Sequence, residues 1–255
     1  MLNLALTLVE VLAAAEQGCR NFDVTFYLNS SFEQDLAYLK SAIPIVEKYA
    51  RRAGFTDCEF HLNASHYDGV FPADPAAAMA VLCYQAMVGR LGGSALFHTK
   101  TLDEGTQLPT IEAHVQSCRA VSAIMDLVGS VIYPDEPLRE ECAMLELEVD
   151  SLMDNMFELG DGDILRGFVA SIKAGTMEFP FSPSKYNAGE AVIVRDAAGA
   201  ARFWNTGKLA LPESSARWHR QKLQDASPNG DGTEPDVLEL MFKSIRYLGG
   251  LQVVK

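Results

Sequence analysis

The sequence predicts an α/β fold over its first half and a mainly helical extension over the rest. Three segments with strand character are each followed by a helical segment. Each unit spans roughly 35 residues, which is typical of parallel strands joined by crossover helices. This spacing fits a doubly wound sheet as well as a β/α barrel, but three strands are too few to close a barrel. The pattern changes beyond Pro134, so we predict a β/α region over residues 1–133 and a carboxyl-terminal extension over residues 134–255.

The first predicted element is a helix over residues 1–15. A signal peptide is the alternative interpretation of this apolar start, but no Lys or Arg precedes the apolar stretch and Glu10 interrupts it. The apolar side chains also recur at helical spacing, as expected for a buried stripe. They are Leu4, Leu8, Val11, Leu12 and Ala15. We therefore expect a helix at this position.

Three strands and three helices alternate after this first helix. The strands are predicted over residues 22–28, 58–62 and 94–99. The helices that follow them are predicted over residues 32–52, 75–88 and 110–128. Polar residues at 29–31 form a natural N-cap group for the first of these helices. Pro44 inside the same helix is expected to bend or divide it.

The extension is predicted to begin with a long acidic helix over residues 137–159, which Gly160 ends. A shorter helix over residues 161–173 follows, and then a segment rich in proline and aromatic residues and a turn-rich tail. The acidic residues within 225–236 resemble a calcium-binding loop only superficially, because the required spacing and the terminal Glu are absent. We interpret that segment as a solvated loop.

The charge and the cysteines limit the classes of partner. The 255 residues include 21 Lys and Arg against 34 Asp and Glu, a formal net charge of -13. Such a surface repels phosphate backbones and anionic lipid heads, so we expect neither a nucleic acid nor a membrane as partner. No apolar run reaches the roughly 20 residues that a membrane span needs. The 5 cysteines are scattered without C-x-x-C spacing, which predicts reduced thiols in a cytoplasmic protein and no metal site.

Common nucleotide-binding and hydrolase motifs are absent. The sequence has no phosphate loop of the G-x-x-x-x-G-K type, no G-x-G-x-x-G and no nucleophile elbow. His61 and His66 are five residues apart, and no carboxylate or Cys accompanies them at ligand spacing. We expect each to be a hydrogen-bonded histidine of a strand or loop.

Lys100 and Glu104 are the most informative local feature, because they directly follow the third predicted strand. Functional groups of β/α folds collect at the carboxyl ends of the strands. Two side chains four residues apart could bind one hydroxyl-bearing ligand from a single loop. They could equally form a surface ion pair, worth about 0–1 kcal/mol. The spacing alone does not decide between these alternatives.

A second feature is the segment 181–189, which combines turn-forming residues with Lys185, Tyr186 and Asn187. Such a segment is typical of an ordered loop with a specific contact surface. The alternative, a loop that packs the tail onto the core, is the one that the residues favour.

Five collinear segments, between about residue 8 and about residue 205, resemble the epsilon subunit of glutamate mutase, also called methylaspartate mutase. The longest and most specific of them is the word P-S-K-Y-N-A-G at 183–189. The other matches are residues 12–18, Phe71 and Pro72 with Asp74, the pair Lys100 and Glu104, and residues 156–160 with Gly162 and Asp163.

The resemblance implies a β/α barrel that closes over adenosylcobalamin and interconverts L-glutamate and (2S,3S)-3-methylaspartate by a radical rearrangement of the carbon skeleton. A barrel suits this chemistry because it excludes water from reactive intermediates. By motif match, Lys100 and Glu104 inherit contacts to the ribose of the adenosyl group. The three predicted strands correspond to the sixth to eighth of the family. The resemblance thus implies a partial (β/α)8 TIM-type barrel with the mainly helical extension, completed by a chain that supplies five more strands.

The family binds cobalamin on a separate small sigma subunit, through a D-x-H-x-x-G motif. Here His66 is followed by Gly69, but Ala64 stands where the motif needs Asp, so a carrier partner is expected. The arginines that bind the two glutamate carboxylates lie on the missing part. Residues 26–29 replace small and acidic residues of the family, and Tyr67 replaces a tryptophan. We therefore take Tyr67 and His66 as possible pocket residues, and Lys185, Tyr186 and Asn187 as possible contact residues.

Three hypotheses follow from the resemblance and the departures. The leading one is the carboxyl-terminal portion of a glutamate mutase-like epsilon subunit, catalytic only with its partners. The second is a non-catalytic remnant or binding module that keeps subunit contacts. The third is a related mutase that acts on another acid.

Overall fold

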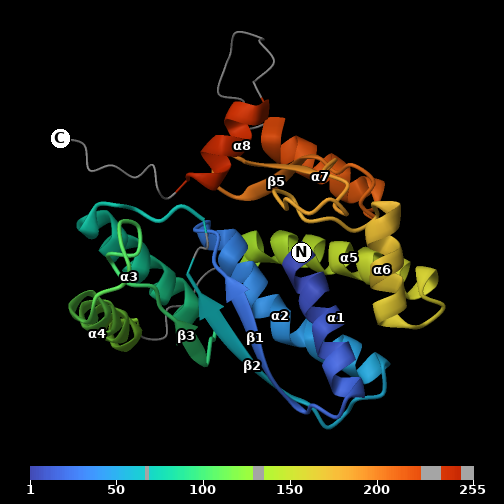
Figure 1. The fold of residues 1–255 in the computed structure, drawn as a ribbon, viewed down its shortest axis with the longest axis horizontal. Coiled ribbons are helices and arrows are strands. Elements are labelled where there is room, and N and C mark those ends of the chain that lie inside the picture. The colour runs from blue at the N-terminus through green and yellow to red at the C-terminus, as the bar shows by residue number, and fades with distance from the viewer. Residues whose placement is uncertain (67–68, 129–134, 225–236, 248–255) are drawn as a thin grey trace.

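The computed structural model describes residues 1–66, 69–128, 135–224 and 237–247. Three parallel strands form its main sheet, and they are neighbours in chain order: β1 (Asn21–Tyr27), β2 (Glu59–Ser65) and β3 (Leu96–His98). Four helices precede, separate and follow these strands: α1 (Leu2–Glu16), α2 (Phe32–Arg52), α3 (Pro75–Leu91) and α4 (Ile111–Leu127). The predicted alternation of strands and helices is thus confirmed, as Figure 1 shows.

The two faces of the main sheet differ in their cover. Alternate residues of β1 point to opposite faces. On one face Phe22, Val24 and Phe26 are buried in the same cluster as residues of α1 and α2. The opposite face is exposed along most of its described length, at Asn21, Asp23, Tyr27, Glu59, His61, Leu96 and His98. The sheet is therefore packed on one side only, and the described residues form no closed barrel.

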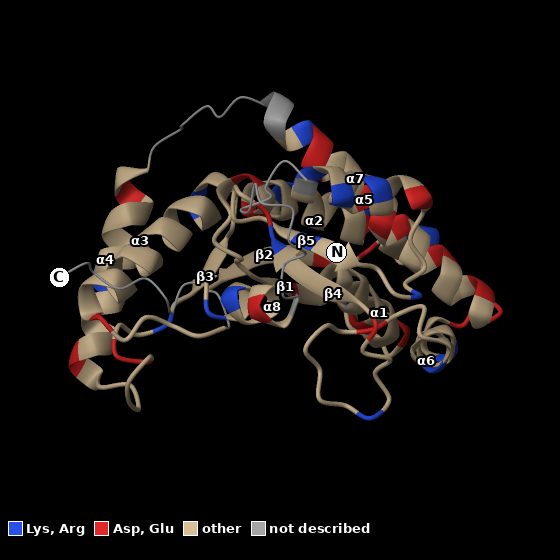
Figure 2. Ribbon diagram, turned by 90° about the horizontal axis from the view of Figure 1, so that it is seen from above, with Lys and Arg blue, Asp and Glu red and all other residues tan. Residues whose placement is uncertain are grey.

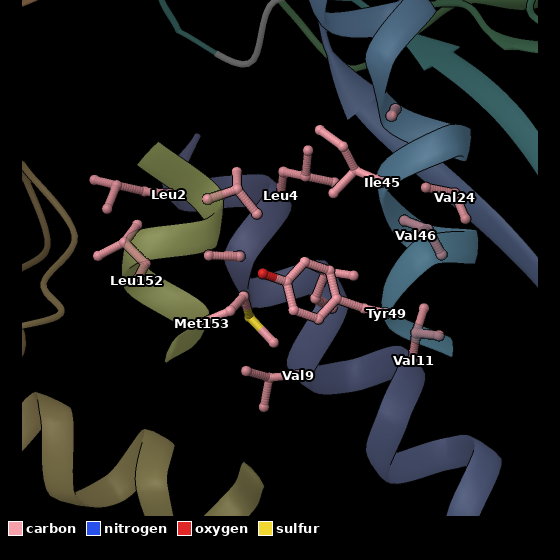
Figure 3. Packing of buried hydrophobic residues seen from close by; sticks show 14 of the residues in the cluster. Leu2, Leu4, Val9, Val11, Val24, Ile45, Val46, Tyr49, Leu152 and Met153 are labelled. Carbon is pink, nitrogen blue, oxygen red and sulfur yellow. The ribbon is translucent and has the colours of Figure 1, made fainter. Parts of the chain in front are cut away.

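The largest core lies between α1, α2 and the first helix of the extension, α5 (Asp135–Leu159). Figure 3 shows the ring of Tyr49, from α2, among side chains that include Leu4 and Met153. Tyr49 is 1% exposed, and its hydroxyl donates to Asp150 of α5 at 2.7 Å. This single side chain thus ties the β/α region to the extension by apolar contact and by a hydrogen bond.

Pro44 does not divide α2, which is continuous from Phe32 to Arg52, so a division at the proline is wrong and a bend there stays a prediction. A proline removes one backbone hydrogen bond from the helix interior. Here the neighbouring residues Ala42, Ile45 and Val46 are buried in the core, and this packing holds the helix together on both sides of the proline.

Residues 135–224 and 237–247 contain four helices and a strand pair. The helices are α5, α6 (Ile164–Ala174), α7 (Glu213–Gln224) and α8 (Val237–Ile245). The strands β4 (Val192–Arg195) and β5 (Ala201–Asn205) form an antiparallel hairpin. The prediction of a turn-rich tail is wrong here, because these two runs of β-forming residues pair across the turn that Gly199 completes at φ 80°. The loop predicted at 225–236 lies outside the described residues.

The start of α6 lies three residues later than the predicted 161. Asp161 and Gly162 both have positive φ, at 52° and 86°, which interrupts the helical path. Asp163 then caps α6, because its Oδ1 accepts from the backbone N–H of Arg166 at 2.9 Å. At the crossing of the two helices, a side chain on Gly167 would collide with the Met156 carbonyl oxygen of α5. The two helices therefore meet at backbone distance.

The hairpin and α8 lie beyond the carboxyl ends of β1 and β2 (Figure 1). Arg195 of β4 donates to Oδ1 of Asn29, two residues after β1, at 3.4 Å. Gln34 of α2 pairs with the backbone of Ala201 through two hydrogen bonds, at 2.9 and 3.0 Å. The extension thus covers part of the edge at which the parallel strands end. No described helix combines the length and the apolar character needed to cross a membrane.

Candidate functional site

A buried chain of hydrogen bonds joins the carboxyl ends of the three parallel strands. His66 directly follows β2, and its Nδ1 lies 2.6 Å from Oε1 of Gln85 on α3. The Nε2 of His66 lies 3.1 Å from Oγ1 of Thr99, which directly follows β3. Gln85 also donates through Nε2 to Oγ of Ser30, just beyond β1, at 2.7 Å. This chain of hydrogen bonds therefore spans the edge at which parallel sheets carry their functional groups.

These contacts define the form of His66. Because Gln85 donates to Ser30 through Nε2, its Oε1 faces the histidine and accepts from Nδ1–H. The Nε2 of His66 then accepts from the Thr99 hydroxyl. Complete burial lowers the pKa of His66 to about 4 against the raising effect of the Gln85 bond, and the charge of Lys100 lowers it further. The imidazole is therefore neutral near pH 7 and is bonded at both ring nitrogens.

The backbone beyond β1 is held in an uncommon conformation. Ser30 has a φ of 66°, in the left-handed region that residues other than glycine rarely adopt. The carboxylate of Asp35, which is 4% exposed, accepts from the backbone N–H groups of Asn29 and Ser30, both at 2.7 Å. Burial raises the pKa of Asp35 to about 7, although these hydrogen bonds and the charge of Arg195 lower it. Asp35 thus fixes the turn that presents Ser30 to Gln85.

Lys100 and Glu104 lie on the loop that follows β3, and the structure brings them together. Nζ of Lys100 lies 3.2 Å from Oε1 of Glu104, and the two side chains are 15% and 35% exposed. The ammonium group also lies 5.8 Å from the ring centroid of Phe71, on the loop after β2. An ammonium, a carboxylate and an aromatic face therefore meet at one partly exposed position; the ion pair is formed, and the binding of a ligand by the two side chains stays a prediction.

Close backbone packing fixes this loop. A Cβ on Gly105 would lie 2.5 Å from the carbonyl oxygen of Pro72, so only glycine allows the loop to approach the segment after β2. The next turn is held by Asp103, whose Oδ2 accepts from the backbone N–H of Thr110 at 3.0 Å and from its hydroxyl at 2.8 Å. Leu102 donates through its N–H to a side chain of α4 at 3.0 Å. The Lys100–Glu104 pair thus stands on a well-anchored loop.

The structure separates the other predicted contact residues from this pair. Asn187 accepts from the backbone N–H of Phe179 at 2.8 Å, and Lys185 lies 5.0 Å from the ring centroid of Tyr186, which is 70% exposed. The segment 181–189 follows α6 in the chain, and Figure 2 places α6 and β3 toward opposite ends of the molecule. Tyr67 lies outside the described residues. The bond of Asn187 joins the segment to the residues that follow α6, and a contact role for Lys185, Tyr186 and Asn187 stays a prediction.

A buried polar cluster in the extension escaped the sequence analysis. Arg202 of β5 is 4% exposed and forms ion pairs with Asp196, at 2.8 Å, and with Glu141 of α5. Beside it, His219 and Ser215 of α7 both contact Glu148 of α5, His219 at 2.7 Å. These residues meet across as many as 71 positions of sequence, so no local motif marks them. Arg202 is paired with two carboxylates beside a cavity of about 380 Å³, which Glu148 and His219 also line, and the cluster thus joins α5, α7 and the hairpin.

No group of three or more His, Cys, Asp or Glu that could hold a metal ion occurs among the described residues.

The family model described as methylaspartate mutase E chain matches residues 1–236. The chain belongs to this family. The match covers both the β/α region and most of the extension, so the two halves are parts of one family pattern.

Curated relatives agree with the family model. The chain is 31% identical over 232 residues to the glutamate mutase epsilon subunit of Escherichia coli, a match that covers 91% of this chain and 48% of that protein. It is 30% identical over 223 residues to the subunit of Treponema denticola, covering 87% of this chain and 46% of that protein. The relative from Halobacterium salinarum is 29% identical over 231 residues, again 91% of this chain and 48% of that protein. The chain therefore spans about half the length of the curated relatives that it matches.

Proposed function

We propose that this chain contributes the adenosyl-binding part of a glutamate mutase-like enzyme that interconverts L-glutamate and (2S,3S)-3-methylaspartate with adenosylcobalamin. The observation that carries the proposal is the Lys100–Glu104 pair at the carboxyl end of the last parallel strand of a methylaspartate mutase family member. This edge is where β/α folds place the groups that bind ligands.

The chemistry of the pair fits the ribose of an adenosyl group. Each ribose hydroxyl is both a donor and an acceptor. Lys100 can donate to one hydroxyl while Glu104 accepts from the same or the neighbouring one, and both bonds involve a charged partner, which strengthens them. The two side chains are 15% and 35% exposed, so part of each is accessible to a ligand. When bound, adenosylcobalamin supplies the radical chemistry, and the residues of this chain hold and orient the adenosyl end.

The uncovered sheet supports the proposal of a partial barrel. Strands that are neighbours in chain order, with helices packed on one face only, form the arc expected of a singly wound β/α ring. Within the described residues β1 and β3 each pair on one side only, with β2. The exposed face of the sheet would then line the inside of the ring, once a further polypeptide segment supplies the remaining strands.

The exposed side of α4, the last helix of the arc, also favours a further polypeptide segment that supplies the remaining strands. On α4 the residues Ala113, Ser117 and Val121 are buried, since the helix packs against α3. On the opposite side Ile111 is 79% exposed and Val115 is 41% exposed. These two apolar residues are one helical turn apart and face away from α3, where the next unit of a ring would pack. We propose that the unmatched half of the family pattern covers this side.

A separate cobalamin carrier is the second proposed partner. His66 cannot act as the lower ligand of the cobalt, because it is fully buried and both ring nitrogens are bonded within the chain. Ala64, at the position where the carrier motif needs Asp, is fully buried in β2. Both observations favour a lower ligand that comes from another subunit. We place the assembly in the cytoplasm, since the cysteines are free thiols.

The test of this function is turnover in an assembled mixture. This chain would be combined with the unmatched half of the Escherichia coli relative and with a cobalamin-loaded sigma subunit, and 3-methylaspartate would be measured. We expect Lys100→Met and Glu104→Gln each to lower kcat/KM for adenosylcobalamin by about tenfold to a hundredfold, the loss typical of a hydrogen bond to a charged group. Lys40→Met, at an exposed position of α2, is the matched control. Equal activity of all three variants would contradict the assigned role.

Tyr27 favours a second candidate, a related mutase that acts on another acid. It is the last residue of β1, and its side chain is 51% exposed on the open face of the sheet. A bulky phenol at this place would narrow the inside of a completed ring. Screening other amino and dicarboxylic acids in the same mixture separates the two candidates. A stable, assembled complex without turnover on any of them would favour a non-catalytic binding module instead.

A further inference from the structure

The hydrogen-bond chain at the strand ends has a feature that the proposed function does not use: it ends on the residue before Lys100. We propose that His66 is a positioning residue, which acts through Thr99 to hold Lys100 at the ligand-facing edge of the sheet. The inference rests on the proposed function only for what Lys100 binds. The positioning itself stands on contacts within the chain.

The contacts run in one direction from β3 to β1. The hydroxyl of Thr99 donates to Nε2 of His66, whose Nδ1–H donates to Gln85, and Gln85 donates to Ser30. Each contact joins two members, so a change at one position is felt by the next. Oγ1 of Thr99 also lies 3.1 Å from the carbonyl oxygen of Lys100, but the one hydroxyl proton is given to His66, so the peptide bond between Thr99 and Lys100 makes the link to the lysine. One side chain, that of Thr99, therefore separates His66 from the backbone that carries the ammonium group.

Apolar contact reinforces the link to β3. The imidazole of His66 and the ring of Phe97 lie edge to face, with centroids 4.9 Å apart. Phe97 belongs to β3, which is only three residues long and pairs with β2 on one side. So short a strand has few ladder hydrogen bonds to fix its end. The histidine supplies a side-chain bond and a ring contact at that place.

The cost of the arrangement argues for a role beyond packing. A fully buried imidazole must find partners for both nitrogens or lose the hydrogen bonds that water would give it. Ser30 reaches the chain only from a left-handed backbone conformation, which costs of order 1 kcal/mol or more and is enriched at functional sites. A valine–leucine contact would hold three strands together without either cost. The chain of hydrogen bonds, in addition, fixes the distances between the ends of the three strands.

The test compares two identical chemical changes on the same sheet. Thr99→Val removes the hydroxyl that binds His66 and keeps the shape of the side chain. Thr25→Val, on β1, removes a hydroxyl that donates to Asp23 at 3.3 Å and lies outside the chain of bonds. The readout is the acylation rate of the Lys100 amine by acetic anhydride, measured by peptide mass spectrometry and divided by the rate of Lys40 in the same sample. The wild-type rate is expected to be low, because the Lys100 side chain is 15% exposed.

We expect Thr99→Val to raise the relative rate of Lys100 about fivefold, the ratio that corresponds to a net hydrogen bond of roughly 1 kcal/mol, and Thr25→Val to leave it unchanged. A merely structural role of His66 would lower the melting temperature and leave the relative rate of Lys100 unaltered. That result would overturn the inference. Imidazole nitrogen NMR gives a second measurement: Thr99→Val should shift the Nε2 resonance of His66, and an unchanged resonance would contradict the proposal. Neither measurement needs the cofactor, so both can be interpreted even if the turnover test of the proposed function fails.

Discussion

Two buried groups at the strand ends are predicted to change stability with pH in opposite directions. The pKa of Asp35 is raised from 3.8 to about 7 by burial, and that of His66 is lowered from 6.5 to about 4 by burial. The Asp35 contribution is fully present below its unfolded value and is lost as the pH rises toward about 7. The His66 contribution is present above pH 6.5 and is lost as the pH falls through about 4. Between these limits the two slopes oppose each other.

The magnitudes follow from the size of each shift. A shift of one pKa unit corresponds to about 1.4 kcal/mol, so Asp35 changes the free energy of unfolding by about 4 kcal/mol across its window. The corresponding change for His66 is about 3 kcal/mol. In the wild type the two contributions largely cancel between about pH 4 and 6.5. Removing one group exposes the slope of the other.

The assay is urea denaturation at several pH values between 4 and 7.5. Relative to wild type, Asp35→Asn should gain about 4 kcal/mol of unfolding free energy as the pH rises across this range. His66→Gln should lose about 3 kcal/mol relative to wild type between pH 4 and 6.5. Asn21→Ser, at an exposed position of β1, changes no titratable group and is the control, which should show no such trend. Variants that differ from wild type by a constant amount at every pH would refute the reasoning.

Three further predictions concern packing. Arg202→Leu leaves the buried carboxylate of Glu141 unpaired and should cost about 3–5 kcal/mol in urea denaturation, whereas Arg51→Leu breaks an exposed pair with Glu47 and should cost less than about 1 kcal/mol. Equal losses would contradict the difference in burial. Gly167→Ala forces α5 and α6 apart and should lower stability by about 1–3 kcal/mol or more, and an unchanged melting temperature would show that the close crossing is wrong. Gly105→Ala should displace the Lys100 loop, seen as faster amide exchange there without global unfolding, and unchanged exchange would argue against the tight approach.

The β/α region was predictable because its information is local. Helical periodicity in α1 and the regular alternation of strands and helices are visible within windows of a few residues. The lack of a closed barrel among the described residues was also foreseeable, since three strands cannot close one. The continuity of α2 through Pro44 was not, because it depends on side chains that pack against the helix from α1 and α5. The hairpin was missed because its two strands are short and lie in a turn-rich context.

The candidate site was likewise predictable only in part from the sequence. Lys100 and Glu104 could be found from their position after a strand, but their pairing depends on the path of the loop that carries them. The role of His66 could not, because its partners come from α3 and from the end of β3, which only the fold brings together. The cluster around Arg202 joins residues of α5 to the hairpin and was invisible for the same reason.

The most direct test of the proposed arc is whether the unmatched half of the Escherichia coli relative binds this chain through α4. Sedimentation velocity would compare the wild type with two double variants. The first is Ile111→Asp, Val115→Asp on α4. The matched control is Leu165→Asp, Val169→Asp on α6, where Leu165 is 48% exposed and Val169 is 51% exposed. We predict a 1:1 complex that the α4 variant weakens by about tenfold or more and the α6 variant leaves intact. A wild-type chain that does not associate, or two variants that bind equally well, would contradict the account.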